Sequence, residues 1–149
     1  MAILEEPIKE PLEIRNYIDG MWVVSEGEYK DVVNPATGKT IATVPISTGE
    51  ELNEAVEAAH AAFPMWREGP PLARARCMMR LRNLLEENFE ELSRIQTMEH
   101  GKAIDESRGE TRRGIENVEV AAGIPSLMLG DYLEDIASGI DEYLIRQPL

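Results

Sequence analysis

The 149-residue sequence contains a single cysteine, few basic residues and no long apolar run. One cysteine excludes an internal disulfide and a metal site built from cysteines. No stretch approaches the roughly 20 apolar residues that a helix needs to cross a bilayer, and the first residues lack the basic segment that begins a signal peptide. We therefore expect a cytoplasmic protein that does not enter membranes.

Positive charge is also scarce, with 15 basic residues against 28 acidic ones and a formal net charge of −13. Proteins that bind nucleic acids or anionic membrane surfaces carry clustered positive charge, so we expect neither partner. The chain is 43% hydrophobic and 29% charged. This composition and length are typical of one globular domain with its own core.

Groups that could perform catalysis or bind a cofactor are missing as well. Cys77 lies near arginines that favour a thiolate, but no base or oxyanion donor accompanies it, so we interpret it as a structural residue. His60 has no second ligand at metal-binding spacing. The glycines within or just after a predicted helix match no phosphate-binding fingerprint; they are Gly109, Gly114, Gly123 and Gly130. We predict no catalytic, metal-binding or cofactor-binding residue.

The first part of the chain predicts short strands. Residues 1–13 are acidic, contain two prolines and are interpreted as a loose arm. Residues 16–24 predict a hairpin around an Asp-Gly turn, and 29–33 and 40–44 predict two further strands. Together the strands form a small antiparallel unit in this prediction.

Three long helices follow in the prediction. Thr48 and Glu51 form a capping box that begins the first helix, and Pro64 should end or kink it. The second helix runs from Pro70-Pro71 to about Glu99, and the glycine at 101 supplies its C-terminal cap. Its N-terminal half carries four arginines, interpreted as a solvated face or, alternatively, a contact patch for an acidic neighbour: Arg74, Arg76, Arg80 and Arg82.

The third predicted helix spans 103–122 and places Arg113 opposite its inner face. That inner face consists of Ile104, Thr111, Ile115, Val118 and Ala122. The stripe around Arg113 is a mixture of small, polar and apolar residues, which suggests that a second surface covers it: Gly109, Glu116, Asn117 and Val120. A covered arginine needs an anion. The anion is either a nearby glutamate or a ligand.

The end of the chain predicts one more strand. Residues 126–136 are expected to form a short helical or irregular piece that wraps the third helix. Residues 140–149 are rich in β-favouring side chains and predict a strand with an unpaired edge, which invites pairing with another chain.

Several motifs resemble the N-terminal part of the aldehyde dehydrogenase superfamily. Three are general to it: Asn34-Pro35-Ala36-Thr37-Gly38, Val44-Pro45-Ile46-Ser47-Thr48 and Glu99-His100-Gly101-Lys102. Two point to the methylmalonate-semialdehyde dehydrogenase branch: Arg113-Gly114-Ile115-Glu116-Asn117-Val118-Glu119 and Pro125-Ser126-Leu127-Met128-Leu129-Gly130-Asp131. The resemblance covers nearly the whole chain but only about the first third of the family's length.

The resemblance implies an α/β fold, seen as α+β in this fragment, with small antiparallel strands, three long helices and a terminal oligomerisation strand. It implies a loose arm over 1–13, an incomplete cofactor-binding domain over 14–136 and the start of an oligomerisation hairpin over 137–149. It also implies that Arg113 holds the carboxylate of the substrate. The catalytic cysteine, the oxyanion asparagine, the general-base glutamate and the NAD-binding loops of the family correspond to segments beyond Leu149.

We therefore expect the N-terminal portion of an NAD-dependent, coenzyme A-acylating methylmalonate- or malonate-semialdehyde dehydrogenase of valine or inositol catabolism, inactive and without cofactor when alone. Its partner would be a complementary downstream chain or a second copy, bound through the strand from Tyr143 to Ile145. The alternatives are a non-catalytic interaction module, a gene remnant, or a fragment of a general aldehyde dehydrogenase.

Overall fold

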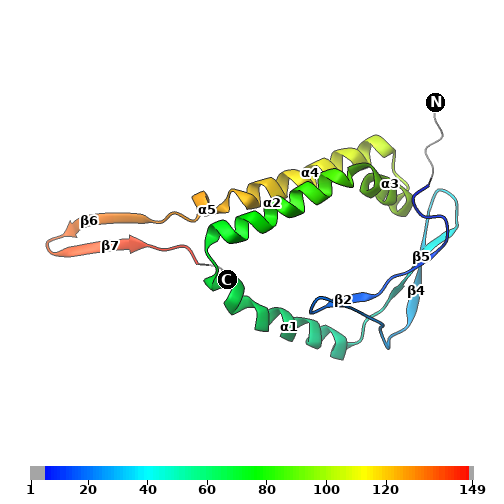
Figure 1. Cartoon of the computed structure of the whole chain (residues 1–149), viewed down its shortest axis with the longest axis horizontal. Coiled ribbons are helices and arrows are strands. Elements are labelled where there is room, and N and C mark those ends of the chain that lie inside the picture. Colours follow the sequence, from blue (N-terminus) through cyan, green and yellow to red (C-terminus); the bar gives the residue numbers. More distant parts are fainter. Residues whose placement is uncertain (1–5, 148–149) are drawn as a thin grey trace.

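The computed structural model describes residues 6–147, and its parts separate clearly in space (Figure 1). Short strands gather at one end, helices α2, α3 and α4 pack side by side, α1 lies apart from them, and a β-hairpin projects from the other end. In chain order the elements are β1 (Leu12–Glu13), β2 (Asn16–Ile18), β3 (Met21–Val23), β4 (Tyr29–Val33), β5 (Thr40–Pro45), α1 (Gly49–Glu68), α2 (Pro71–Glu87), α3 (Phe89–His100), α4 (Ile104–Ala122), α5 (Ile124–Leu127), β6 (Asp131–Ala137) and β7 (Ile140–Leu144).

The strands at the N-terminal end confirm the expected hairpin and the two strands that follow it. β2 and β3 pair antiparallel around the Asp19-Gly20 turn, where both residues have positive φ, and β4 pairs antiparallel with β5. The unit is not wholly antiparallel, because β1 joins β5 in parallel. The end of the predicted loose arm is therefore ordered as a sheet strand, while residues 1–5 of that arm lie outside the described residues.

Helix α1 begins with the predicted capping box. The Glu51 N–H donates to the Thr48 hydroxyl at 3.2 Å, and the Thr48 N–H donates to the Glu51 carboxylate at 2.8 Å. The prediction that Pro64 ends or kinks this helix near Phe63 was wrong about the end, because α1 continues to Glu68. Proline removes one donor from the helix interior. The unpaired carbonyl can bond to water here, since α1 contains no buried residue.

The single long helix predicted over 71–99 is in fact two helices that meet at Asn88. The Asn88 side-chain amide donates to the Leu84 carbonyl at 2.7 Å, and its backbone N–H donates to the same carbonyl at 3.1 Å. Asparagine competes in this way with regular helix hydrogen bonds. Apolar residues recur at helical spacing on both sides of Asn88, so the sequence pattern does not reveal the break.

Gly101 ends α3 as predicted, with φ +82°. The left-handed conformation is cheap only for glycine. A Cβ atom at this position would lie 2.7 Å from the Pro35 ring. The turn after β4 and the turn after α3 therefore touch, and two motifs that are distant in sequence form one contact.

The best-buried part of the helical unit lies between α3 and α4. Ile115 is 1% exposed, while Ser93 and Ser107 are fully buried. The Ser93 hydroxyl donates to the Phe89 carbonyl at 2.8 Å, and the Thr97 hydroxyl donates to Ser107 at 2.8 Å. Small side chains with satisfied hydroxyls let the two helices approach closely around the Ile115 side chain.

The chain leaves the helices through α5 and then forms a hairpin. The helical or irregular piece predicted over 126–136 was wrong beyond α5, because β6 pairs antiparallel with β7. The expected strand after residue 140 is confirmed as β7 but ends at Leu144, and residues 148–149 lie outside the described part. Every residue of both strands is exposed, although Tyr132 and Tyr143 stack across them with ring centroids 4.8 Å apart.

Candidate functional site

Arg113 lies on the exposed side of α4, as the helical pattern predicts. The inner face is confirmed, with Ile115 buried and Val118 half-buried, while the stripe around Arg113 faces solvent and Val120 is 62% exposed. Within residues 6–147, nothing covers this stripe, so the described chain does not provide the second surface that was expected over it, and no hydrogen bond or ion pair occupies the Arg113 guanidinium. No hydrogen bond or ion pair joins Arg113 to a glutamate in the described chain, although the charge of Arg113 contributes to the lowered pKa of Glu110.

Two neighbouring arginines of the same helix, Arg108 and Arg112, bind carboxylates of other helices. Arg112 donates two hydrogen bonds to the Glu86 carboxylate of α2 and lies over the Phe89 ring, 4.8 Å from its centroid. Arg108 donates to both oxygens of Glu90 in α3, at 3.0 and 2.9 Å. These two arginines, four residues apart, hold α4 against the preceding helices. Arg113, rotated about 100° from Arg112, is left free of that structural task.

The arginines lower the pKa values of the carboxylates with which they pair. Hydrogen bonding from Arg112 lowers the pKa of Glu86, and hydrogen bonding from Arg108 lowers the pKa of Glu90. The pKa of Glu110 is lowered chiefly by a hydrogen bond from Lys102, with the charge of Arg113 a smaller cause. The Glu110 carboxylate forms an ion pair with Lys102 and accepts a hydrogen bond from Gln96, and no hydrogen bond joins it to Arg113 in the described chain.

Cys77 and His60 are the other two residues that the sequence analysis considered. Cys77 is half-buried, and its sulfur accepts a hydrogen bond from Arg80 at 2.9 Å. His60 is exposed on α1. No group of three metal-ligating side chains occurs among the residues that the structure describes. No helix in that part of the chain combines the length and apolarity needed to span a membrane.

The predicted arginine cluster on α2 is not one solvated face. Arg82 pairs with Glu86 at 3.1 Å and with Glu119 at 2.9 Å. Arg74 is half-buried in an apolar pocket. Only Arg76 and Arg80 have exposed side chains, as the prediction required. Sequence reasoning missed Arg74, because its surroundings come partly from α5, fifty residues farther along the chain.

The turn between β5 and α1 holds a carboxylate at the helix N-terminus. The one place where a strand runs parallel to another and leads into a long helix is β5 followed by α1. There the Glu51 carboxylate already accepts hydrogen bonds from the Thr48 and Glu26 N–H groups and from the Ser25 hydroxyl. These bonds, with Thr48 the largest cause, lower the pKa of Glu51. A fixed negative charge at the helix N-terminus repels a phosphate.

Within residues 6–147, the helices form a platform on which Arg113 is exposed without a hydrogen bond or ion pair, and a family comparison gives this platform a context. The model of the aldehyde dehydrogenase family matches residues 22–149. The chain belongs to the aldehyde dehydrogenase family. It is 51% identical over 137 residues to malonate-semialdehyde dehydrogenase 2 of Geobacillus kaustophilus (strain HTA426), a match that covers 91% of this chain and 28% of that relative.

Solved structures agree with this membership. The methylmalonate-semialdehyde dehydrogenase of Oceanimonas doudoroffii superposes with a TM-score of 0.87 and 39% identity, over 92% of this chain and 28% of its own. A Sinorhizobium meliloti 1021 protein assigned to the same enzyme and complexed with NAD gives the same TM-score and identity, over 95% of this chain and 29% of its own. The α/β fold expected for the N-terminal part of the family is therefore confirmed. The chain spans less than a third of the length of these relatives.

Proposed function

We propose that this chain supplies the N-terminal part of a malonate- or methylmalonate-semialdehyde dehydrogenase and that Arg113 binds the carboxylate of the aldehyde substrate. The observation that carries the proposal is the difference in pairing among three arginines of α4. Arg108 and Arg112 are held by internal carboxylates, whereas Arg113 is exposed without an ion pair in the described chain. A guanidinium is suited to a carboxylate because its planar fork of donors matches the two oxygens.

The chemistry of the complete enzyme lies outside this platform in our proposal. NAD would accept the hydride and coenzyme A would take the acyl group, and both would be bound by the polypeptide that the relatives have in addition. The position of the Glu51 carboxylate at the strand-to-helix turn after β5, where a dinucleotide-binding turn would hold a phosphate, supports this part of the proposal. We therefore expect the chain alone to be inactive and to leave NAD unbound.

A chimera tests this proposal directly. This chain would replace the matching segment of the Geobacillus kaustophilus relative, and kcat/KM would be measured for malonate semialdehyde and for propanal, which lacks the carboxylate. Hydrogen bonds to a charged group contribute about 1.5–3 kcal/mol, so Arg113→Ala should lower the preference for the acidic aldehyde by about tenfold to a hundredfold. The rate with propanal should change little.

Arg108→Ala in the same helix is the matched control. It removes a pair of hydrogen bonds to Glu90, so it should lower the melting temperature without changing the selectivity. A folded chimera that is inactive with either aldehyde would contradict the assignment of the chain to this enzyme. An active chimera whose selectivity is indifferent to Arg113 would contradict only the role of that residue and favour a general aldehyde dehydrogenase.

The hairpin favours a second, compatible role as an assembly element. Its strands expose a row of apolar side chains, and one edge of β7 is unpaired within the described residues. We propose that the segment around Tyr143 to Ile145 pairs with a complementary chain or a second copy of this one. Sedimentation of the chain before and after Tyr143→Lys tests this role. A monomer in both cases would contradict it.

A further inference from the structure

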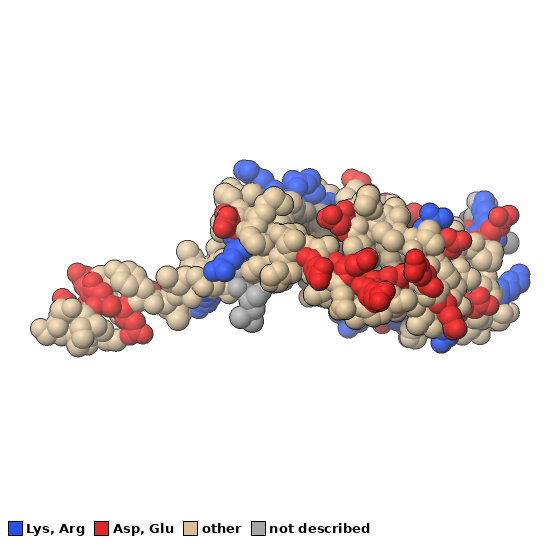
Figure 2. All heavy atoms as spheres, turned by 90° about the horizontal axis from the view of Figure 1, so that it is seen from below, with Lys and Arg blue, Asp and Glu red and all other residues tan. Residues whose placement is uncertain are grey.

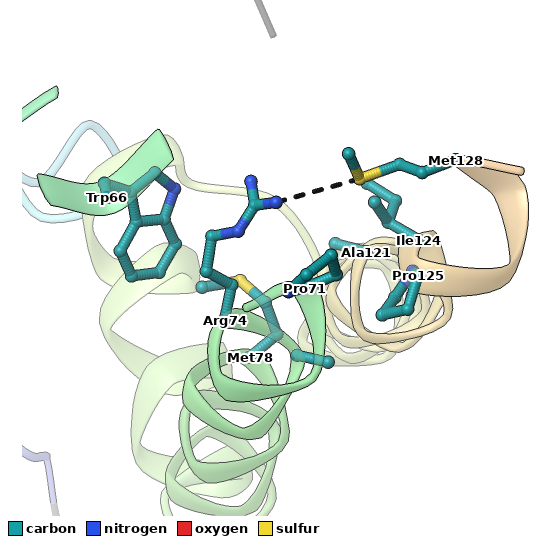
Figure 3. Close-up of a pocket in the computed structure, with 9 residues that line it drawn as sticks. Trp66, Pro71, Arg74, Met78, Ala121, Ile124, Pro125 and Met128 are labelled. Carbon is teal, nitrogen blue, oxygen red and sulfur yellow. Dashed lines mark hydrogen bonds between the residues drawn. The ribbon is translucent and has the colours of Figure 1, made fainter. Parts of the chain in front are cut away.

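A pocket of about 220 Å³ lies where the end of α1, the first turns of α2 and α5 meet (Figure 3). Its walls are apolar and include Trp66 from α1, Met78 from α2, and Ile124 and Met128 from α5 and the residue after it. The one charged group in the lining is Arg74, whose side chain points toward Met128 in Figure 3. This combination of apolar walls and a single cation is specific enough to indicate a class of ligand.

The Arg74 guanidinium lacks an oxygen acceptor on the edge best suited to a carboxylate. Its Nε atom is buried and has no hydrogen-bond partner in the described structure. Its Nη2 atom reaches only the Met128 sulfur, at 3.9 Å, and a thioether is a weak acceptor. The Nε and Nη2 hydrogens point in the same direction, so they can donate together to the two oxygens of one carboxylate. Leaving a buried N–H of a charged group unpaired is costly, which favours an anion at this edge.

The position of the pocket along α2 adds to its preference for a negative group. Arg74 is in the first turn of α2, and no acidic residue occurs in that turn. The N-terminus of a helix carries partial positive charge that reinforces an arginine placed there. At the same time, one cation among apolar side chains cannot solvate a phosphate or a dicarboxylate. The walls instead select an apolar body attached to a single carboxylate.

We propose that this pocket binds small organic monocarboxylates through the Nε and Nη2 edge of Arg74, with the apolar part of the ligand against Trp66 and Met78. The carboxylate would replace the weak contact with the Met128 sulfur. This inference does not depend on the function proposed for Arg113, which does not line the pocket. It assigns the chain a second anion site on a different part of the helical unit.

Fluorescence of Trp66 is a local reporter for the test. The chain contains two tryptophans, so Trp22→Phe leaves Trp66 as the only one. Titration of this variant with 4-phenylbutyrate should give a saturable change in emission, and the neutral analogue 4-phenylbutyramide should bind about ten to a hundred times more weakly, because its amide carries no negative charge and offers one acceptor oxygen instead of two. Arg74→Gln should reduce the binding of the acid to that of the amide. Arg74→Lys, which keeps the charge without the planar fork, should recover it only in part.

Arg76→Gln provides the matched control, since Arg76 is exposed on the same helix and does not line the pocket. It makes the same change in net charge and should leave the affinity for 4-phenylbutyrate as it was. Equal binding of the acid and the amide would overturn the proposal, as would equal losses with Arg74→Gln and Arg76→Gln. Circular dichroism of each variant verifies that the helices remain folded, and if Arg74→Gln unfolds, the Arg74→Lys titration decides the question.

Discussion

Substitution of Gly101 by alanine tests whether the contact between the turn after α3 and the turn after β4 stabilises the platform. Gly101 has φ +82°, and the added Cβ would lie 2.7 Å from Cγ of Pro35. The proline ring is rigid, so the clash cannot be relieved by rotating a flexible side chain. The substitution therefore combines two costs that differ in origin, one from the backbone and one from packing.

The two costs can be estimated separately. A non-glycine residue in the left-handed region loses roughly 1–2 kcal/mol, and overpacking a closed contact loses typically 1–3 kcal/mol. Gly38→Ala isolates the first cost, because Gly38 has φ +71° and an added Cβ there meets no atom within 4 Å. Gly101→Ala should thus lower the free energy of unfolding by about 2–5 kcal/mol and Gly38→Ala by about 1–2 kcal/mol.

Urea denaturation followed by circular dichroism at the helix band measures both variants. Equal slopes with respect to urea would show that the comparison concerns stability alone. In a domain of about 150 residues, each 1 kcal/mol shifts the melting temperature by roughly 2–4 °C, so a thermal scan gives an independent check. Equal losses in the two variants would refute the reasoning, since the contact with Pro35 would then contribute nothing.

Two further predictions concern the helical unit and the hairpin. Because the pKa of Glu86 is lowered in the folded protein, its ion pair stabilises the fold at pH values above the usual carboxyl pKa of 4.5, and this stability should be lost as the pH falls through the lower folded-state pKa. Glu86→Gln should therefore flatten the dependence of the unfolding midpoint on pH in that acidic range. An unchanged dependence would contradict this prediction. A Cβ at Gly130 would overlap the Leu144 carbonyl oxygen, so Gly130→Ala should increase amide hydrogen exchange in β6 and β7 and leave exchange in α4 unchanged.

Features fixed by neighbouring residues were predictable from the sequence. The capping box at Thr48 and Glu51 depends on side chains three residues apart, and the end of α3 depends on the freedom of Gly101 to adopt positive φ. The break at Asn88 was missed because its cause is one side-chain hydrogen bond, whereas the apolar periodicity spans both helices. β6 was missed for a different reason. A strand needs a partner for its backbone groups, and the sequence of β6 lacks the alternation of apolar and polar residues that indicates a strand.

The negative net charge of the chain also made its candidate anion-binding sites hard to predict from the sequence. Figure 2 shows groups of acidic side chains along the body of the molecule and on the projecting hairpin. A net charge of −13 does not suggest anion binding, yet Arg74 and Arg113 are both suited to it. Contacts between helices determine which arginines form ion pairs within the chain. The sequence pattern predicted that Arg113 faces away from the inner face of α4 but could not show that Arg108 and Arg112 pair with carboxylates of α3 and α2.

The same excess of negative charge determines how Arg113 would select its substrate. A long-range field from this chain repels an acidic aldehyde, so the preference must come from short-range hydrogen bonds to the guanidinium. Arg113→Lys in the chimera keeps the charge but loses the planar fork, and it should therefore restore only part of the selectivity lost in Arg113→Ala. The ratio of kcat/KM for malonate semialdehyde and propanal measures this recovery. Full recovery with lysine would mean that charge alone attracts the substrate and that the geometry of the fork is irrelevant.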